Sequence, residues 1–477
     1  VTMQNISKQI HRASLEILND PGVCLHDPII LKALKKRGFQ VEGQRVRFTE
    51  EQVMACLATA PSTFTLMGRN PLHTISIGNN SRCIAPAYGA PEVVTADHQR
   101  RPACFNDYIR IAKLVQATDL LHLNGGILAQ PGDLEADLAS LVMVYTALTL
   151  SDKPLLGIQG TEYQVRRIME LGCIAFGGEA EFKSCPRFLF LVNTLSPLQI
   201  DANALATMRV CGEYNQAAII TPGLMFGSTS PITPAGSMVQ ANAEFLAGAC
   251  VTQALSPGMP LIYGCLGHPA DLRTGGISLG SPSRFAFRIM ATQMAEKYNL
   301  PNRGIGAVTD AGQVSAQSGY EAMMTLSSDY QYRTSLIVHG AGILASFAQF
   351  SFEQFMVDLE IIRMLNKNNE PLVVDEASMA LDIIRQAGPG GEFLTSPHTH
   401  KHCRTLLFQP ELAPPKTNIP QAYRTAFARL IEKGLSRLEE KYCTPDIPKN
   451  IQQGMDDYMK ECGIPSLTLE KVLSAKQ

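Results

Sequence analysis

"RFLFLVN", residues 187–193, is a short apolar run that ends in a polar residue. A run of this length and composition is typical of a strand that is buried on both faces of a parallel sheet. Similar runs recur at intervals of about 30 to 45 residues, which is the length of one strand–helix unit. They are "LLHLNGG" (120–126), "PLLGIQG" (154–160), "AAIITPG" (217–223), "PLIYGCL" (260–266), "RGIGAV" (303–308) and "SLIVHGAG" (335–342).

Helix-length amphipathic segments separate these runs, so the chain alternates strand and helix. Seven such units, with an eighth strand near "GEFLTSP", predict an α/β fold, a TIM (β/α)8 barrel over residues 105–405. A doubly wound open sheet would give the same alternation. However, no GxGxxG sequence opens a helix after the first strand, and the number of units fits the barrel better.

Two further regions flank the predicted barrel. Residues 1–104 contain helical patterns, such as "TEEQVMACLATAP", and then short alternating runs between 63 and 95. We expect them to form an N-terminal helical extension with a small β element. Residues 406–477 are Pro-rich and then helical, and this C-terminal helical tail is expected to pack on the barrel exterior or on a partner.

Composition narrows the function classes. The formal net charge is −2 over 477 residues, and no run of Lys or Arg is present, which argues against nucleic-acid binding. No stretch of 18 uninterrupted apolar residues occurs, so a membrane span is not expected. The N-terminal residues form an amphipathic helix pattern rather than a signal peptide. The 12 cysteines are scattered singly, which predicts reduced thiols in a cytoplasmic protein.

In a (β/α)8 barrel, ligands bind at the C-terminal ends of the strands. That rule selects candidate residues before any motif does. Where the predicted strands end, the chain supplies Asn124, Gln159, Asn193, Ser196, Pro222, Tyr263, His268, Asp310 and His339. His398 follows the predicted eighth strand and would begin a histidine cluster at the same end of the barrel.

That cluster is "PHTHKHC", residues 397–403, whose histidines and Cys403 are ligand types that suit Zn²⁺. On a strand, the three histidines would share one face, whereas on a helix only His398 and His402 lie one turn apart. No CxxC or HExxH sequence completes a recognisable metal set. The sequence therefore favours hydrogen-bonding or substrate-facing histidines over a metal site.

Several motifs of covalent and nucleotide chemistry are missing from the sequence. There is no P-loop, no GxSxG elbow and no Rossmann fingerprint. Carboxylates near the predicted strand ends are few, namely Asp271, Asp310 and Glu321. We therefore expect a barrel that binds and orients a small molecule, rather than one that carries a nucleophile–base relay.

Long ordered blocks of the chain resemble one protein family. They are "SPITPAGSMVQANAEFLAG" (230–248), "PLIYGCLGHPADLRTGG" (260–276), "AQSGYEAMMTL" (316–326), "HGAGILASFAQFSFEQFMVDLEI" (339–361) and "GPGGEFLTSPHTHKH" (388–402). On these blocks the chain resembles the trimethylamine methyltransferase superfamily, whose members are corrinoid-dependent methyltransferases with a TIM-barrel fold. Since the sequence contains only the standard twenty amino acids, it is similar to the non-pyrrolysine branch.

The resemblance implies an enzyme that moves a methyl group from a quaternary amine to Co(I) of a cognate corrinoid protein. Substrates in this branch include glycine betaine, proline betaine, carnitine and γ-butyrobetaine, and the reaction serves methanogenesis or acetogenesis. The partner would supply the corrinoid, so no permanently bound cofactor, no metal and no catalytic residue beyond the partner's Co(I) is expected. The His-rich block is not a recognised zinc site in this family. A homo-oligomer is expected.

A quaternary nitrogen is a cation, which aromatic faces and carboxylates can hold. Because the sequence lacks Trp, we expect the aromatic contacts from Tyr and Phe. The expected substrate-binding residues are Tyr88, Tyr263, Asp271, Asp310, Gln317, Tyr320, Glu321, His339, Phe347 and His398. The carboxylate of a betaine would meet Arg273, His339, His398 or the backbone of "GAG" (340–342).

The chain departs from the common family pattern after Gly342. Many members have a Trp-Leu-Glu-Gly-Gly run there, whereas this sequence has Ile343-Leu344-Ala345-Ser346-Phe347. The pocket is thus specialised, and the identity of the substrate does not follow from the resemblance to the family. Two alternatives stay open: a metal-dependent TIM-barrel lyase that uses the His398–Cys403 cluster, and a non-catalytic betaine-binding protein.

Overall fold

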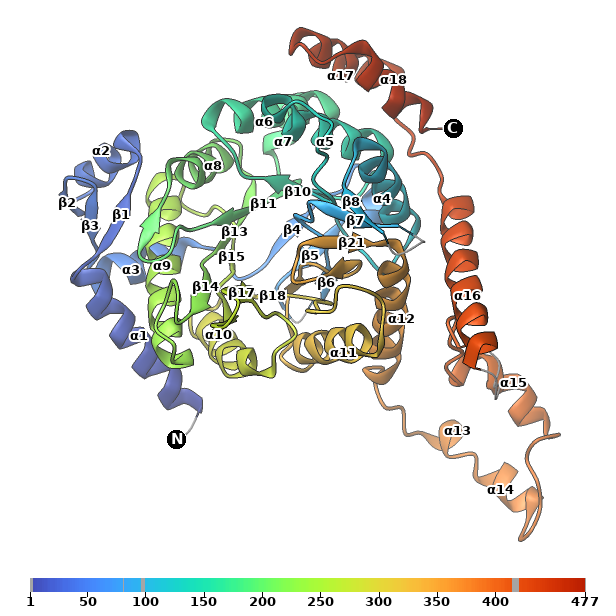
Figure 1. Ribbon diagram of the computed structural model, residues 1–477. Helices are drawn as coiled ribbons and strands as arrows, with labels where there is room; N and C mark the ends of the chain where they lie inside the picture. The colour runs from blue at the N-terminus through green and yellow to red at the C-terminus, as the bar shows by residue number, and fades with distance from the viewer. Residues whose placement is uncertain (1–2, 80, 96–98, 414–419, 477) are drawn as a thin grey trace.

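Parallel strands and the helices between them make up the centre of the fold in the computed structural model, which describes residues 3–79, 81–95, 99–413 and 420–476 (Figure 1). One parallel sheet has the order β15-β13-β11-β10-β9. These strands are β9 (Asn124–Gly125), β10 (Leu155–Ile158), β11 (Phe188–Asn193), β13 (Ala217–Thr221) and β15 (Leu261–Tyr263). A second has the order β18-β19-β6, with β18 (Arg303–Gly304), β19 (Leu336–Ile337) and β6 (Cys83–Ile84).

The two parallel sheets adjoin at both of their edges. A parallel bridge between Tyr263 and Asn302 joins the end of β15 to the start of β18. At the other side, the backbone N–H of His122 donates to the carbonyl of Ile84 over 2.7 Å, which places β6 beside the segment that enters β9. The two sheets and the helices between their strands therefore form one mixed α/β fold.

All seven strands predicted from the apolar runs are confirmed, but the predicted eighth strand is wrong. Residues 391–396 of "GEFLTSP" form a turn outside both sheets. The place between β19 and β9 is taken instead by β6, whose Cys83 and Ile84 pair in parallel with Leu336 and Ile337. The predicted domain boundary at residue 104 places this strand in the N-terminal extension instead of the barrel.

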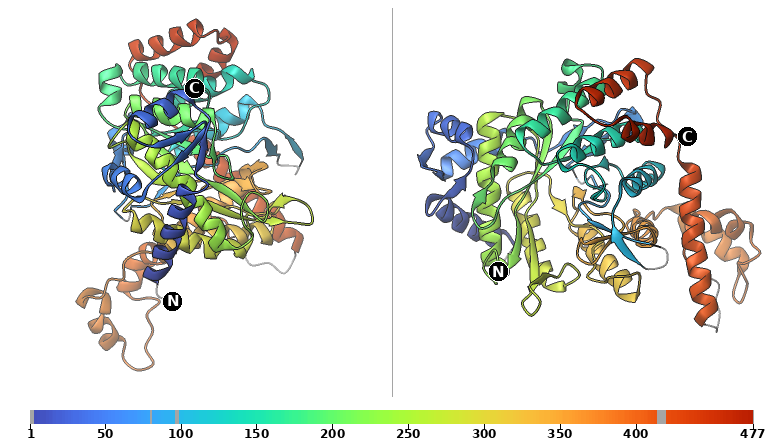
Figure 2. Two further views of the ribbon diagram at one scale, coloured as in Figure 1. Left: turned by 90° about the vertical axis from the view of Figure 1, so that its left-hand side faces the viewer. Right: turned by 45° about the horizontal axis from the view of Figure 1, so that its top comes forward.

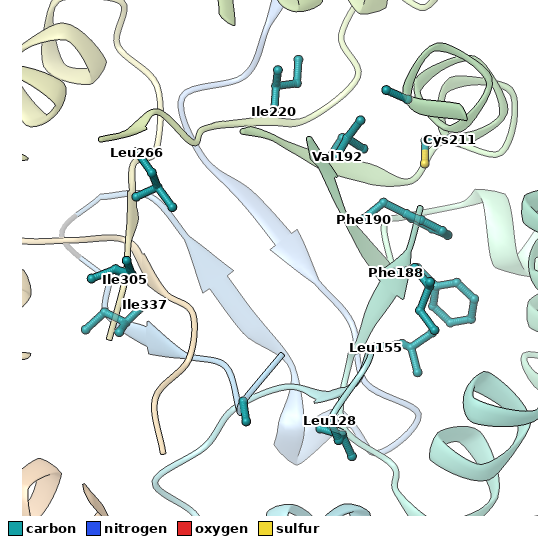
Figure 3. Packing of buried hydrophobic residues seen from close by; sticks show 14 of the residues in the cluster. Leu128, Leu155, Phe188, Phe190, Val192, Cys211, Ile220, Leu266, Ile305 and Ile337 are labelled. Atoms are coloured by element: carbon teal, nitrogen blue, oxygen red, sulfur yellow. The ribbon is translucent and has the colours of Figure 1, made fainter. Parts of the chain in front are cut away.

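Side chains of the strands alternate between two apolar clusters. Leu189 and Leu191 of β11 belong to an inner cluster that also contains Phe64 and Leu66. Those two come from a hairpin of β4 (Phe64–Leu66) and β5 (Ile75–Ile77), which fills the N-terminal end of the strands. Phe188, Phe190 and Val192 point the other way, toward the surrounding helices (Figure 3).

The helices that follow the strands surround them. They are α4 (Phe105–Ala117), α5 (Ala136–Leu150), α6 (Glu162–Ala175), α7 (Glu179–Lys183), α8 (Ala202–Glu213), α9 (Pro234–Leu255), α10 (Phe285–Lys297), α11 (Ala316–Gln331) and α12 (Phe352–Asn368). Several begin with side-chain caps that satisfy free backbone N–H groups, such as Thr161 with Gln164 on α6 and Ser315 with Ser318 on α11. The caps fix where each strand–helix loop ends.

The N-terminal extension packs on the outside of α9 (Figure 1). It comprises α1 (Met3–Asn19), β1 (Val23–Leu25), α2 (Pro28–Lys36), β2 (Gln40–Glu42), β3 (Arg45–Arg47) and α3 (Glu50–Thr59). Its strands continue into β12 (Gln199–Ile200), which lies in the loop after β11. The helices of this region match the predicted helical patterns, whereas its three strands were not expected, because the β element was predicted between residues 63 and 95.

Two small sheets are built from the loops that follow the strands. One contains β14 (Gly223–Phe226), β16 (Leu266–Asp271) and β17 (Gly276–Ile277). The other contains β7 (Glu92–Val94), β8 (Arg100–Pro102), β20 (Ile343–Leu344) and β21 (Gln349–Ser351). They contribute side chains to the site described below.

The C-terminal part has two portions. Residues 369–411, here called the arm, contain α13 (Glu376–Met379), α14 (Leu381–Ala387) and α15 (Pro397–Leu406), and they extend away from the body (Figures 1 and 2). None of the arm residues is buried. The chain then returns as α16 (Pro420–Lys441), α17 (Lys449–Glu461) and α18 (Ser466–Ser474), which pack on α4, α12, α6 and α5. In the described residues, no helix is long and apolar enough to cross a membrane.

Candidate functional site

Polar side chains gather at the C-terminal ends of the parallel strands, here called the mouth. Arg303 starts β18, and its partner across the ladder is Leu336 of the inner cluster, so its side chain points inward. Its guanidinium donates from Nη1 to Thr221 Oγ1 over 3.0 Å and from Nη2 to His339 Nε2 over 3.4 Å. Thr221 ends β13 and His339 follows β19, so the long side chain brings the positive charge to the mouth.

Asp329 explains why the chain holds Arg303 in this position. The next residue, Gly304, faces helix α11, where a Cβ atom would lie 2.3 Å from the Asp329 carboxylate. That carboxylate accepts hydrogen bonds from the backbone N–H groups of Ile305 and Gly306 and from Arg288. The strand therefore turns its glycine outward and its arginine inward.

His339 lies in a left-handed backbone conformation, with φ of +60°. Such a conformation is unfavourable for most non-glycine residues and is concentrated at functional sites. It is held here by two backbone hydrogen bonds, from His339 N to Pro86 O and from Ala307 N to His339 O. The side chain is 4% exposed.

Burial determines the charge of His339. Burial, followed by the nearby Arg303 charge, holds the pKa of this imidazole well below its usual range, so the ring is neutral at pH 7. Because an arginine can only donate, Nε2 must accept, and the proton of the neutral ring then sits on Nδ1. That buried Nδ1 has no protein partner, and neither does the buried Nε of Arg303. Two donors at the mouth are thus left without acceptors.

Aromatic rings flank this polar pair. Tyr88, which follows β6, meets the His339 ring edge-on at a centroid distance of 6.5 Å. Its ring lies against Gly126, where a Cβ atom would approach within 2.8 Å, so only glycine leaves the ring room there. Phe347 packs on the other side, with its ring centroid 4.4 Å from that of His339. These faces could receive a cation.

The Phe347 ring is presented by an unusual turn between β20 and β21. Ala345, Ser346 and Phe347 all have positive φ, of 47°, 52° and 77°. A left-handed residue costs roughly 1–2 kcal/mol, so the turn needs external support. Ser346 supplies it, because its backbone N–H donates to Thr309 O over 2.9 Å and its hydroxyl donates to Asp310 Oδ1 over 2.5 Å.

Two predicted carboxylates hold loops together next to this turn. Asp310 accepts from the Ser278 hydroxyl and from the backbone N–H groups of Leu279 and Gly280. Glu321 accepts from Thr309 Oγ1, from the Asp310 N–H and from Gln317 Nε2. Both carboxylates therefore position the mouth loops, and Gln317, which is exposed on α11, is hydrogen-bonded to Glu321 alone of the two.

His268 of β16 completes the group. Its ring lies edge-on to Phe347 at 6.4 Å, it is 5% exposed, and its Nδ1 has no protein partner. Burial and the charges of Arg284 and Arg303 hold the pKa of this histidine well below its usual range. The mouth thus combines two neutral histidines, two aromatic rings and one buried arginine.

Three other predicted residues lie away from this group. Tyr263 points outward from β15, where its hydroxyl donates to Asn242 over 3.0 Å and its ring packs on Phe245 at 4.4 Å. Strand residues alternate between faces, and this one faces the helices. Asp271 pairs with the exposed Arg273 on the β16–β17 hairpin. Tyr320 is 61% exposed on α11.

His398 lies farthest from its expected place. It sits on α15 of the arm, because the predicted eighth strand does not form, and its ring packs on that of His402 at 4.7 Å, one helical turn away. Among the described residues, no group of three or more His, Cys, Asp or Glu side chains is placed to hold a metal ion. The arm histidines therefore do not belong to the mouth.

Arg303 is the residue that sequence reasoning missed. The sequence predicts site residues at the ends of the strands, whereas Arg303 begins its strand and reaches the mouth only through its long side chain. A signal was present, because an arginine inside an apolar strand run must find a partner or a ligand. "NRGIGAV" (302–308) contains such an arginine.

The chain is similar in sequence to one protein family and to several of its individual members. A family model described as trimethylamine methyltransferase (MTTB) matches residues 2–462. The glycine betaine methyltransferase of Desulfitobacterium hafniense (strain Y51) is 37% identical over 406 residues, which covers 85% of each chain. The proline betaine:corrinoid methyltransferase of Eubacterium limosum is 29% identical over 464 residues and covers 95% of each chain.

Solved structures show a similar fold. The hydroxylamine complex of MtmB matches with a TM-score of 0.54 at 12% identity, over 92% of this chain and 88% of that chain. The Methanosarcina barkeri monomethylamine methyltransferase (MtmB) matches with a TM-score of 0.53 at 11% identity, over 91% of this chain and 87% of that chain. This likeness concerns the arrangement of elements alone.

Proposed function

Because the chain belongs to the trimethylamine methyltransferase (MTTB) family, we propose that it transfers a methyl group from a betaine-type quaternary amine to Co(I) of a cognate corrinoid protein. Relatives named for glycine betaine and proline betaine support this reaction class. The relative named L-carnitine:corrinoid methyltransferase, at 26% identity, supports a quaternary amine more broadly.

One observation carries the proposal. The mouth sets aromatic rings, Tyr88 and Phe347, directly beside the buried Arg303–His339 pair. A betaine carries a fixed positive charge and a carboxylate, so it matches aromatic faces next to hydrogen-bond donors. The carboxylate of Asp310, which accepts from the hydroxyls of Ser278 and Ser346, holds loops together, and the proposed reaction takes its nucleophile from another protein.

The bond changes of the reaction need no proton from the chain. The C–N bond to one methyl group breaks, its electron pair stays on nitrogen, and the amine leaves as a neutral tertiary amine. The methyl group would be taken up by the partner's corrinoid, which would supply the attacking electron pair. Acid–base groups are therefore unnecessary, and neutral His339 and His268 suit the site as hydrogen-bonding groups rather than as acids.

The chain's own residues would bind and orient the substrate. Holding the quaternary nitrogen against Tyr88 and Phe347 would fix which methyl group faces outward, toward the docked partner. Each aromatic contact with a cation contributes about 0.5–2 kcal/mol. Burial of Arg303 and His339 keeps water away from the other end of the ligand, which strengthens hydrogen bonds to it.

We extend the proposal to the whole assembly. The strands β6, β9, β10, β11, β13, β15, β18 and β19 would close into one eight-stranded barrel, and the corrinoid protein would dock over its mouth. Because the 12 cysteines are all unpaired, a reducing compartment such as the cytoplasm fits the protein. A homo-oligomer remains part of this proposal.

A turnover assay tests the proposed function. The protein is mixed with reduced corrinoid protein and, in separate reactions, with glycine betaine, proline betaine, carnitine, γ-butyrobetaine and trimethylamine. We expect the Co(I) absorbance to decay, and the demethylated amine to form, with a betaine and not with neutral trimethylamine. Product formation without any corrinoid would contradict the proposal. Tight betaine binding without turnover would favour a binding protein instead.

A further inference from the structure

The mouth contains buried donors that the fold itself does not use. Arg303 is 3% exposed and His339 is 4% exposed, so both are taken out of water on folding. Yet Arg303 Nε and His339 Nδ1 have no protein partner. A buried donor without an acceptor destabilises the folded state, and proteins seldom retain one that has no use.

Both of these atoms are donors, so they call for an anion rather than a cation. Arginine donates from every nitrogen, and the neutral His339 ring donates from Nδ1 because its Nε2 faces Arg303. The guanidinium charge would repel a quaternary nitrogen placed against it. It would attract a carboxylate, with which arginine forms charge-assisted hydrogen bonds.

We propose that Arg303 and His339 form a carboxylate receptor that makes a zwitterion, rather than any quaternary amine, the ligand of this site. This inference rests on the proposed use of a quaternary amine and makes Arg303 a specificity-determining residue. His268, whose buried Nδ1 also lacks a protein partner and whose ring lies beside Phe347, borders the same receptor.

The spacing of the receptor limits the length of the ligand. The His339 imidazole is shared: its Nε2 lies 3.4 Å from Arg303, and its ring packs on Phe347 at 4.4 Å. A ligand that touches both the donors and the aromatic rings must therefore carry its two charges close together. Betaines with one carbon between nitrogen and carboxylate fit this spacing, whereas γ-butyrobetaine separates the charges by three carbons.

A comparison of ligands provides the first test, because it needs no variant of the protein. Isothermal titration calorimetry of the full chain would compare glycine betaine, γ-butyrobetaine and tetramethylammonium, which has no carboxylate. We expect glycine betaine to bind roughly 10- to 100-fold more tightly than tetramethylammonium, the loss expected for hydrogen bonds to a charged group. Equal affinities, or no binding of glycine betaine, would overturn the receptor. Equal or tighter binding of γ-butyrobetaine would overturn the spacing argument.

A matched pair of variants provides the second test. Arg303→Lys keeps the charge but loses the fork of donors, so glycine betaine should bind roughly tenfold or more weakly while tetramethylammonium is unaffected. Arg12→Lys, the same change on the exposed surface of α1, should alter neither affinity. If Arg303→Lys weakens both ligands equally, Arg303 supports the fold and does not recognise the carboxylate.

The two proposals fail in different ways. Selective binding of glycine betaine without methyl transfer to any corrinoid protein would refute the proposed function and leave the receptor standing. Turnover of betaines and of tetramethylammonium at similar kcat/KM would refute the carboxylate receptor and leave the proposed function standing.

Discussion

Two buried cations lie at opposite ends of the parallel strands, and their partners differ. Lys153 precedes β10 at the N-terminal end, is 6% exposed, and donates to the carbonyls of Val115, Thr118 and Leu121 over 2.6–2.7 Å. Burial lowers the pKa of Lys153 to about 7, but three carbonyl acceptors at this distance require the protonated ammonium group, whose three donors then each have an acceptor. Arg303 at the mouth has five donors, and its Nε has no protein acceptor.

The difference separates a structural cation from a ligand-binding one. Lys153 satisfies carbonyls at and beyond the C-terminal end of α4, where a helix favours positive charge. Its partners are all backbone atoms of the fold. Arg303 is buried equally well but is incompletely paired, so folding alone does not account for it. Burial of a charge is therefore less informative than the completeness of its hydrogen bonds.

Matched substitutions by methionine should give the largest contrast. Lys153→Met leaves three buried carbonyls without a donor, so we expect the free energy of unfolding to fall by about 3 kcal/mol or more. Arg303→Met removes two hydrogen bonds, and we expect a loss of about 1 kcal/mol. Urea denaturation followed by circular dichroism would measure both. Equal losses of stability would contradict the assignment of Lys153 as structural and Arg303 as ligand-binding.

His339→Ala should reduce glycine betaine affinity by roughly ten- to a hundred-fold, because a hydrogen bond to a charged group is worth about 1.5–3 kcal/mol. His339 is buried, and its φ is +60°, so alanine is strained at this position. His339→Gly removes the same imidazole without that strain. Calorimetry should give the two variants similar affinities, whereas the glycine variant should melt at a higher temperature.

Acid should destabilise the mouth through its histidines. The pKa values of His339 and His268 are held well below 6.5, so the folded chain keeps both neutral while the unfolded chain takes up protons below that pH. The unfolded state then binds more protons, and stability is lost as the pH falls below about 6.5. His339→Asn should show a shallower loss between pH 7 and 5, measured by urea midpoints. An unchanged slope would contradict this assignment.

The smallest effect is expected for Tyr263→Phe. This residue was predicted to line the site, but its hydroxyl donates to Asn242 among the helices. The substitution should cost about 1 kcal/mol of stability and leave the KM for the betaine unchanged. A rise in KM would show that Tyr263 contributes to substrate binding, contrary to its position among the helices.

The sequence predicted the strands well because their signal is local. Runs such as "RFLFLVN" (187–193) are continuous and apolar, and each became a strand of a parallel sheet. β6 was missed because Cys83–Ile84 is short and is followed by Pro86, which interrupts any longer run. Its role depends on pairing with β19, some 250 residues later, and no local pattern records that pairing.

The candidate site was also predicted only in part, because local sequence patterns indicate strand ends but not long-range pairing. His339, Phe347 and Tyr88 meet at the mouth, and Asp310 and Glu321 hold its loops. Which face a strand residue takes could not be predicted for Tyr263, since both faces of these strands are buried and apolar. His398 was misplaced because its position depended on a strand that does not form.

The arm has a consequence for how the chain would withstand cleavage. None of its residues is buried, and turns separate its short helices, so a protease would find accessible peptide bonds there. The helices beyond it remain attached to the body by ion pairs such as Arg110–Glu439 and Lys441–Asp119 and by the buried Ile431 and Leu435. A single cut in the arm would therefore give two fragments on a denaturing gel and one particle in solution, with the mouth intact.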